Sequence, residues 1–319
     1  RVIIRKTDSV TFRIHSMDVI SIIISAGKSS VDVALYTLLP IMVVMLIIMK
    51  YLSVRGVLDV IVRWLAPLLK PFGLTGMSAF ALIQINFVSF AAPLATLAIM
   101  DKRGVSDRHM AATLAMCFAM GQGNVFYPLM PFGLHWTTSI IISVAGGLCA
   151  AAFTWYVTGR RLSATETASS EPLPDAEQNN QGILSVINSA GADAIRLALG
   201  AIPMLILSLS IVGLMQAAGV IEWLHHILMP VLNFMHIPDS FVLPALVKCV
   251  AGGTAYFGVI SDLVQQGAVT ANQINASAGL LIQTFDLPGI GIFLGISSRF
   301  VRLFRYVIPA ALIGILIRT

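Results

Sequence analysis

Lys248 is the side chain of this sequence with the clearest potential for chemistry, because it lies inside an apolar stretch. Residues 238–260 are long enough to cross a membrane, and their only other charge is Asp239 near the start. An ammonium group in the hydrocarbon core is costly unless it is paired or hydrated, so such a lysine indicates a functional site. An anionic group on a solute would be its simplest partner. The alternative is a lysine that snorkels to the interface.

Polar side chains and glycines gather at three further places in apolar segments. Gln84 is followed by Asn86, Ser89 and Pro93, the last three on one helical face. Two interruptions, Gly121–Asn124 and Gln283–Gly289, stand at comparable positions in the two halves of the chain. Irregular backbone at membrane depth survives only where it is buried in protein or lines a wet cavity. Paired interruptions therefore predict a transport site, and the alternatives are interhelical hydrogen bonds or ordinary extramembrane turns.

The predicted solute contacts are polar residues and glycines of these four places. They are Gln84, Asn86, Ser89, Pro93, Gln122, Asn124, Lys248, Gly252, Gly253, Thr254, Tyr256, Gln283 and Asp286. Asp286 and Lys248 would form a reasonable buried ion pair. The sequence lacks the motifs of metalloproteases, serine hydrolases, P-loop enzymes and Rossmann enzymes, so we expect neither an enzyme nor a cofactor. Its three cysteines lie singly in apolar runs and predict free thiols, and no spacing of ligands singles out a metal site.

The composition predicts that these residues sit in a membrane. Hydrophobic residues make up 57% of the 319 residues and charged residues only 11%, and the mean hydropathy is +0.88. Soluble proteins contain about a quarter charged residues. The net charge of +5 comes from basic residues that flank apolar segments, which favours membrane orientation over nucleic-acid binding. We predict an all-α polytopic protein of the inner (plasma) membrane, whose partners are the lipid bilayer, a small solute and, as an open question, a coupling ion or further copies of the chain.

An internal duplication is predicted from residues that recur at one offset. Gly56 and Gly219 each open an amphipathic segment suited to the membrane interface, and Gly104 and Gly267 keep the same separation of 163 residues. Each half would hold about four hydrophobic segments, with broken helices among them. The expected domains are a basic N-terminal segment (1–30), a first repeat (31–161), a polar cytoplasmic linker (162–190) and a second repeat (191–319).

Basic residues near the segment ends favour a cytoplasmic N-terminus and a cytoplasmic linker, if the first half crosses four times. Residues 76–100 are counted here as one crossing. The same count places Arg299, Arg302 and Arg305 outside, which suggests that one segment is a re-entrant hairpin. The sequence leaves open whether the two repeats are parallel or inverted.

The segments also resemble a known superfamily. Gly56-Val57-Leu58 and the stretch Ile83–Leu94 resemble the nucleoside-recognition (Gate) repeat of spore-maturation protein A, and Gly219–Glu222 with Leu246–Thr254 resembles spore-maturation protein B. The chain is similar to a single-chain fusion of the two. Gate repeats also occur in concentrative nucleoside transporters and in ferrous iron permeases, so the resemblance implies transport. Lys248-Cys249 departs from the Arg-Pro of the B-type pattern, and the GTPase domain of the iron permeases is missing.

We therefore predict a secondary carrier or facilitator for a small solute, nucleoside-like or anionic, with its site at the interface of the repeats. The second hypothesis is a non-transporting membrane scaffold or regulator of the spore-maturation type, in which the polar midplane residues only join helices. A metal-ion permease is the third.

Overall fold

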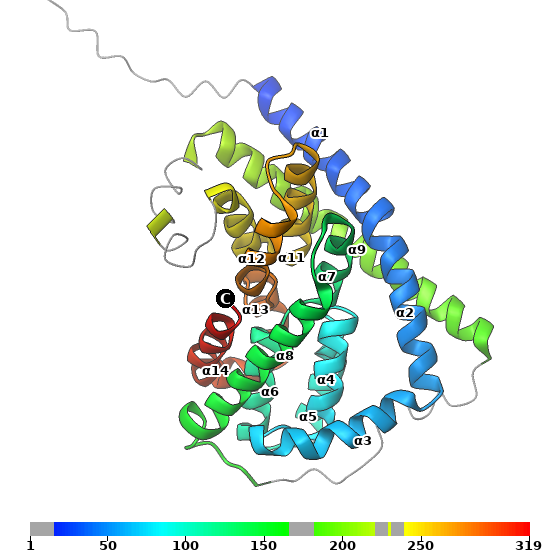
Figure 1. Ribbon diagram of the computed structural model, residues 1–319, viewed down its shortest axis with the longest axis vertical. Coiled ribbons are helices and arrows are strands. Elements are labelled where there is room, and N and C mark those ends of the chain that lie inside the picture. Colours follow the sequence, from blue (N-terminus) through cyan, green and yellow to red (C-terminus); the bar gives the residue numbers. More distant parts are fainter. Residues whose placement is uncertain (1–15, 166–181, 221–228, 231–238) are drawn as a thin grey trace, which may run out of the picture.

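The computed structural model describes residues 16–165, 182–220, 229–230 and 239–319. These residues form helices and connecting turns, with no strand among them (Figure 1). The α-helices are α1 (Ser16–Asp32), α2 (Leu39–Val54), α3 (Val57–Leu69), α4 (Gly76–Phe87), α5 (Pro93–Lys102), α6 (Asp107–Ala119), α7 (Gly123–Leu129), α8 (Trp136–Phe153), α9 (Ile183–Ala217), α11 (Val242–Gln265), α12 (Ala271–Leu281), α13 (Leu287–Leu294) and α14 (Ser298–Ile317).

Five of these helical segments are long and apolar enough to cross a membrane, or up to six if the bent pair α3–α4 counts as one span. α1 and α2 are joined by a π-helical stretch, Val33–Leu38, and α1 begins inside the basic segment 1–30. Long apolar segments and exposed side chains such as Tyr36 and Trp64, each 78% exposed, identify a multi-pass helical membrane protein. Two further hydrophobic stretches are pairs of shorter helices: α4 and α5 over 76–102, and α6 and α7 over 107–129.

Helix α3 has the two faces expected of an interfacial helix. Gly56 precedes it with φ of 70°, a left-handed conformation that glycine adopts without strain. Leu58 and Val62 are buried, whereas Trp64 and Leu68 are 78% and 68% exposed. A turn leads from α3 into α4 at an angle of 105°. The corresponding segment after Gly219 has its predicted polar face, Glu222, His226 and Asn233, outside the described residues.

The segment 76–100, predicted to be one crossing, is instead a helical hairpin. Thr75 and Ser78 form a capping box that starts α4, and Pro93 starts α5 at a position where its missing N–H costs nothing. The two arms are antiparallel, because Arg103 Nη1 at the end of α5 lies 3.9 Å from Met77 Sδ at the start of α4. A continuous helix would separate these residues by roughly 40 Å. The apolar composition is the same for a span and a hairpin, which explains the error.

Helix α11 is also interrupted, at Gly252, whose φ of 86° and ψ of −179° are not helical. Leu243 near one end and Gln266 just beyond the other line the same cavity of about 350 Å³. A straight helix would hold them about 35 Å apart. The chain therefore folds back at Gly252, the first residue of the pair Gly252-Gly253 among the predicted solute contacts.

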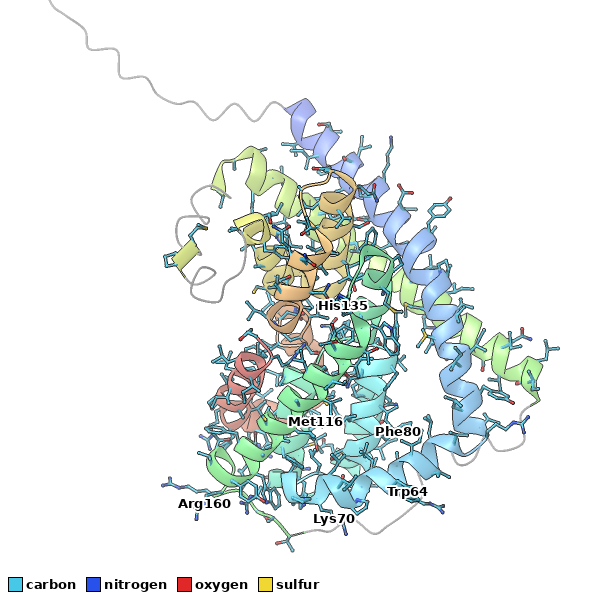
Figure 2. The ribbon with its side chains drawn as sticks, in the orientation of Figure 1. Trp64, Lys70, Phe80, Met116, His135 and Arg160 are labelled. Carbon is cyan, nitrogen blue, oxygen red and sulfur yellow. The ribbon has the colours of Figure 1, made fainter. Side chains whose placement is uncertain are left out.

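The ends of the elements lie at two opposite faces of the molecule. At face A, the residues 70–73, 101–108, 155–163 and 299 come together, since Tyr156 Oη donates to Pro71 O at 2.7 Å and Arg299 pairs with Asp101 and Asp107 at 3.1 and 2.6 Å. At face B, residues 133–135 meet 266–275, as Asn275 Nδ2 donates to Gly133 O at 2.9 Å. Figure 2 shows Trp64, Lys70 and Arg160 at one end and His135 well away from them.

The chain passes between these faces three times from α1 to the end of α8: through α1–α2, through α6–α7 and through α8. The start of α1 and the linker that follows α8 therefore lie at opposite faces. The prediction of a cytoplasmic N-terminus and linker assumed four crossings in the first half, whereas the hairpin α4–α5 returns to face A and leaves three passages. The hairpin also explains the position of Arg299. A fourth crossing would have placed Arg299 outside, but it lies beside Asp101 and Asp107 at face A.

Candidate functional site

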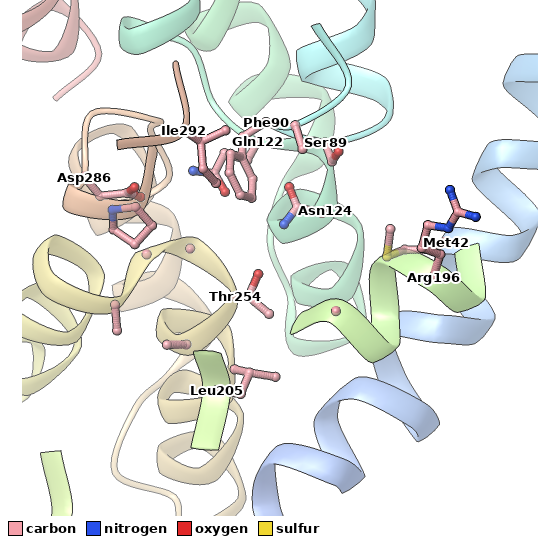
Figure 3. A pocket seen from close by; sticks show the side chains of 17 residues that line it. Met42, Ser89, Phe90, Gln122, Asn124, Arg196, Leu205, Thr254, Asp286 and Ile292 are labelled. Atoms are coloured by element: carbon pink, nitrogen blue, oxygen red, sulfur yellow. The ribbon is translucent and has the colours of Figure 1, made fainter. Parts of the chain in front are cut away.

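The candidate site is a cavity of about 310 Å³ where the interrupted helices meet (Figure 3). The α4–α5 turn, the α6–α7 break, the α11 break and the α12–α13 break form one side, and α2 and α9 close the other. The lining residues are Met42, Ser89, Phe90, Ala91, Gln122, Asn124, Arg196, Gly200, Leu205, Ala251, Gly252, Gly253, Thr254, Ala255, Asp286, Pro288 and Ile292.

The two broken helix pairs, α6–α7 and α12–α13, satisfy each other's backbone groups. Gln122 Nε2 donates to Gln283 O at 2.8 Å, and Thr284 N donates to Phe118 O at 3.3 Å. The Thr284 hydroxyl donates to Met120 O at 3.2 Å. Lipid offers no hydrogen-bond partner to a free backbone N–H or C=O group, so these bonds allow the helices to be interrupted in a membrane. The interruptions predicted at comparable places in the two halves are thus in direct contact.

The cavity wall carries polar atoms that have no partner. Ser89 Oγ, Gln122 Oε1 and Asn124 Oδ1 are buried and make no hydrogen bond in the described part of the chain. An unsatisfied buried polar group costs about 1–3 kcal/mol, so three on one cavity suit a ligand that donates hydrogen bonds. Figure 3 shows Gln122 and Asn124 near one another, with Thr254 across the cavity from them.

Lys248 and Asp286 form a buried ion pair at the edge of the cavity. Lys248 Nζ contacts Asp286 Oδ2, and the two side chains are 0% and 2% exposed. The other carboxylate oxygen, Oδ1, accepts from Gly289 N at 2.7 Å and caps α13. Asp286 therefore balances the lysine and also the positive end of a helix dipole. Lys248 does not snorkel to the interface, and it needs no anionic solute to balance its charge.

Seven of the predicted site residues line the cavity: Ser89, Gln122, Asn124, Gly252, Gly253, Thr254 and Asp286. The other six do not line the cavity. Asn86 Oδ1 accepts from Ser143 Oγ at 2.7 Å, and Gln84 Oε1 accepts from Thr96 Oγ1 at 2.8 Å. Lys248 lies behind Asp286, Pro93 begins α5, Gln283 offers its backbone carbonyl to Gln122, and Tyr256 is fully buried.

The predicted set omitted the apolar wall and the contribution of α9. Phe90 and Ile292 stand on the cavity but have no polar group to mark them in an apolar sequence. Arg196 was detectable as a charge inside the apolar stretch 195–217. Among the described residues, no three His, Cys, Asp or Glu side chains come close enough to hold a metal ion. The three cysteines are free.

Comparisons with known proteins agree with the resemblance seen in the sequence. Residues 35–130 match the family model of the Gate domain, described as nucleoside recognition. The fold is similar to CNTnw in an inward-facing substrate-bound state, with a TM-score of 0.65 and 18% identity over 94% of this chain and 81% of that one. A CNTnw variant in an outward-facing state gives a TM-score of 0.65 and 16% identity over 94% and 82% of the two chains. No curated protein matches the sequence significantly.

Proposed function

We propose that this protein carries a small, neutral, polar solute across the membrane, and that the solute binds in the cavity between the helix breaks. The observation that carries the proposal is the set of unpartnered atoms Ser89 Oγ, Gln122 Oε1 and Asn124 Oδ1 on a cavity of about 310 Å³. Small-molecule sites have this size, with mostly apolar walls and a few placed polar groups.

The Lys248–Asp286 pair favours a neutral solute over an anionic one, and Arg196, the other cation on the cavity, is exposed. Lys248 is the cation from which an anionic solute was predicted, and Asp286 already neutralises it. A solute with N–H or O–H donors would satisfy the free oxygens, and Phe90 offers an aromatic face for a planar ring. A nucleoside has both features. The Gate description and the substrate-bound state of the similar fold support the same class.

The two halves are further proposed to be inverted repeats. Gly56 and Gly219 have φ of 70° and 68°, and Gly104 and Gly267 have φ of 69° and 72°, so both pairs at the offset of 163 share a conformation. α1–α2 run from face B to face A, and α9 runs the other way, since Lys50 pairs with Asp193 and Ile22 lines a cavity with Gly213 and Gln266. Inverted repeats with a midplane site are a common plan of secondary transporters.

Face A is proposed to be cytoplasmic. It collects Lys70, Lys102, Arg103, Arg108, Arg160 and Arg161, whereas the face B residues 129–136 and 266–275 contain no Lys or Arg. The count covers described loops only, because the basic residues Arg1, Arg5, Lys6 and Arg13 lie outside the described residues. Cytoplasmic loops carry such an excess of basic residues. The linker 162–190 is then cytoplasmic, and the start of α1 lies on the other side.

Ligand binding by the purified protein tests the proposal. Nucleosides, nucleotides, organic anions and divalent metals are compared by the shift in melting temperature, which a ligand at about 100 times its Kd raises through roughly 2.7 kcal/mol of stabilisation. A shift from neutral nucleosides that is lost in Gln122→Ala and Asn124→Ala, and kept in the control Gln265→Ala, is expected. No shift from any class would favour the scaffold hypothesis, and a shift only from anions or metals would refute a neutral solute.

A further inference from the structure

Arg318 is a buried cation that the proposed solute site does not use. Arg318 is 4% exposed and follows the last turn of α14. Its Nη1 donates to Ala119 O at 2.5 Å and its Nη2 donates to Ile282 O at 2.7 Å. Ala119 is the last residue of α6, and Ile282 is the C-cap of α12. One guanidinium group therefore joins the two broken helices at the point where both open.

Two backbone carbonyl oxygens are the partners of the Arg318 guanidinium group, whose Nε is buried without a partner in the described part of the chain. Among the described residues, no Asp or Glu forms an ion pair with Arg318. The C-terminal end of a helix carries a partial negative charge of roughly half a unit, and two such ends converge here. Their combined charge matches one cation, and the planar guanidinium group places a donor on each carbonyl oxygen.

Two glycines make room for this arginine. A Cβ atom at Gly146 of α8 would lie 2.4 Å from Arg318 Cγ, and one at Gly279 of α12 would lie 1.9 Å from Arg318 O. The first contact is with the side chain, the second with the backbone that carries it. Both distances are far below van der Waals contact. The two glycines therefore let the stem and backbone of Arg318 pass close to α8 and α12, which brings its guanidinium group to the carbonyl oxygens of Ala119 and Ile282.

We infer that Arg318 is an internal cation that joins two broken helices through their C-terminal carbonyl oxygens, and that it is a positioning residue for the cavity. It holds the C-terminal ends of α6 and α12 together, and Gln122 and Asp286 enter the cavity wall three and four residues beyond these contacts. Removal of the guanidinium group leaves the carbonyl oxygens Ala119 O and Ile282 O without their donors. A small cation with N–H donors, such as free guanidinium, then binds in the space.

Melting temperatures of variants test the inference without any solute, so the test is independent of the proposed function. Only the positioning role of Arg318 rests on that function. Arg318→Ala and Arg318→Met should each melt roughly 5–10 °C lower than the parent, and Arg318→Lys should lose less than half of that. Millimolar guanidinium should raise the melting temperature of Arg318→Ala more than choline at equal ionic strength does. It should not do so for the parent or for Arg302→Ala, which removes an exposed arginine of the same helix.

The variants separate charge from packing. Equal stability of Arg318→Met and the parent would overturn the inference, because a neutral side chain would then suffice. Equal responses of Arg318→Ala to guanidinium and choline would overturn the cation site. If the alanine variant cannot be purified, the comparison of the Met and Lys variants still decides whether the positive charge is needed.

Discussion

The ion pair between Lys248 and Asp286 gives the sharpest prediction on stability. Both side chains are buried, at 0% and 2% exposure, and the carboxylate also caps α13. Replacement of Lys248 by methionine keeps the length and removes the charge, so Asp286 becomes an uncompensated buried anion. Breaking a buried pair in this way costs about 3–5 kcal/mol.

The double variant Lys248→Met, Asp286→Asn should recover most of this loss. Asparagine still caps a helix, and a buried pair replaced by neutral groups is often no less stable than the original. Each kcal/mol moves the melting temperature by about 2–4 °C in proteins of 150–250 residues, so Lys248→Met should melt roughly 6–20 °C lower than the parent. The double variant should melt within a few degrees of the parent.

The assay is thermal unfolding in one detergent, followed by intrinsic fluorescence, with Lys50→Met as a matched control. Lys50 pairs with Asp193 at 2.5 Å, but the side chains are 31% and 48% exposed, so its loss should cost only about 0–1 kcal/mol. A Lys248→Met protein as stable as the control variant would refute the reasoning, and so would a double variant less stable than the single one.

Three further predictions concern the cavity, the topology and the face A ion pairs. Gly253→Ala should abolish solute-induced thermal shifts, because its Cβ would lie 2.4 Å from Gln122 Oε1. The control Gly291→Ala, whose Cβ has nothing within 4 Å, should bind the solute as the parent does. Equal binding by the two variants would contradict the site. For the topology, the native cysteines are replaced by serine and single cysteines are introduced. Cysteines at Lys102, Arg161 and Arg302 should react with an impermeant maleimide from one side of the membrane, and a cysteine at Thr270 from the other. Labelling of positions 102 and 302 from opposite sides would exclude the hairpin. Arg299→Ala should cost about 1 kcal/mol in low salt and less in high salt, since its pairs are partly exposed; a loss that grows with salt would argue against an electrostatic origin.

The helical membrane class could be predicted from the sequence, and the break at Gly252 and several cavity-lining residues also have local signatures. Lys248 and Asp286 stand out as charges in apolar surroundings, and Gly252-Gly253 is a local backbone signal. Ser89, Gln122 and Asn124 are polar residues beside Gly or Pro interruptions. Local chemistry is enough for such residues, because burial makes each one costly without a function.

The topology could not be predicted, because it depends on contacts between distant residues. Nothing in the composition of 76–100 separates a span from a hairpin, and the contact between Met77 and Arg103 that distinguishes them is tertiary. Arg318 follows an apolar run, where an interfacial arginine is normal. Only its contacts with Ala119 and Ile282, 199 and 36 residues away, show that it is buried between helix ends.

Uptake into proteoliposomes tests the central claim most directly. Vesicles that contain the parent protein should accumulate or equilibrate the radiolabelled nucleoside that gives the largest thermal shift, faster than empty vesicles. Vesicles with Gly253→Ala should match the empty ones, and vesicles with Gly291→Ala should match the parent. Binding of the nucleoside without any uptake above empty vesicles would contradict the account and identify the cavity as the sensor of a non-transporting protein.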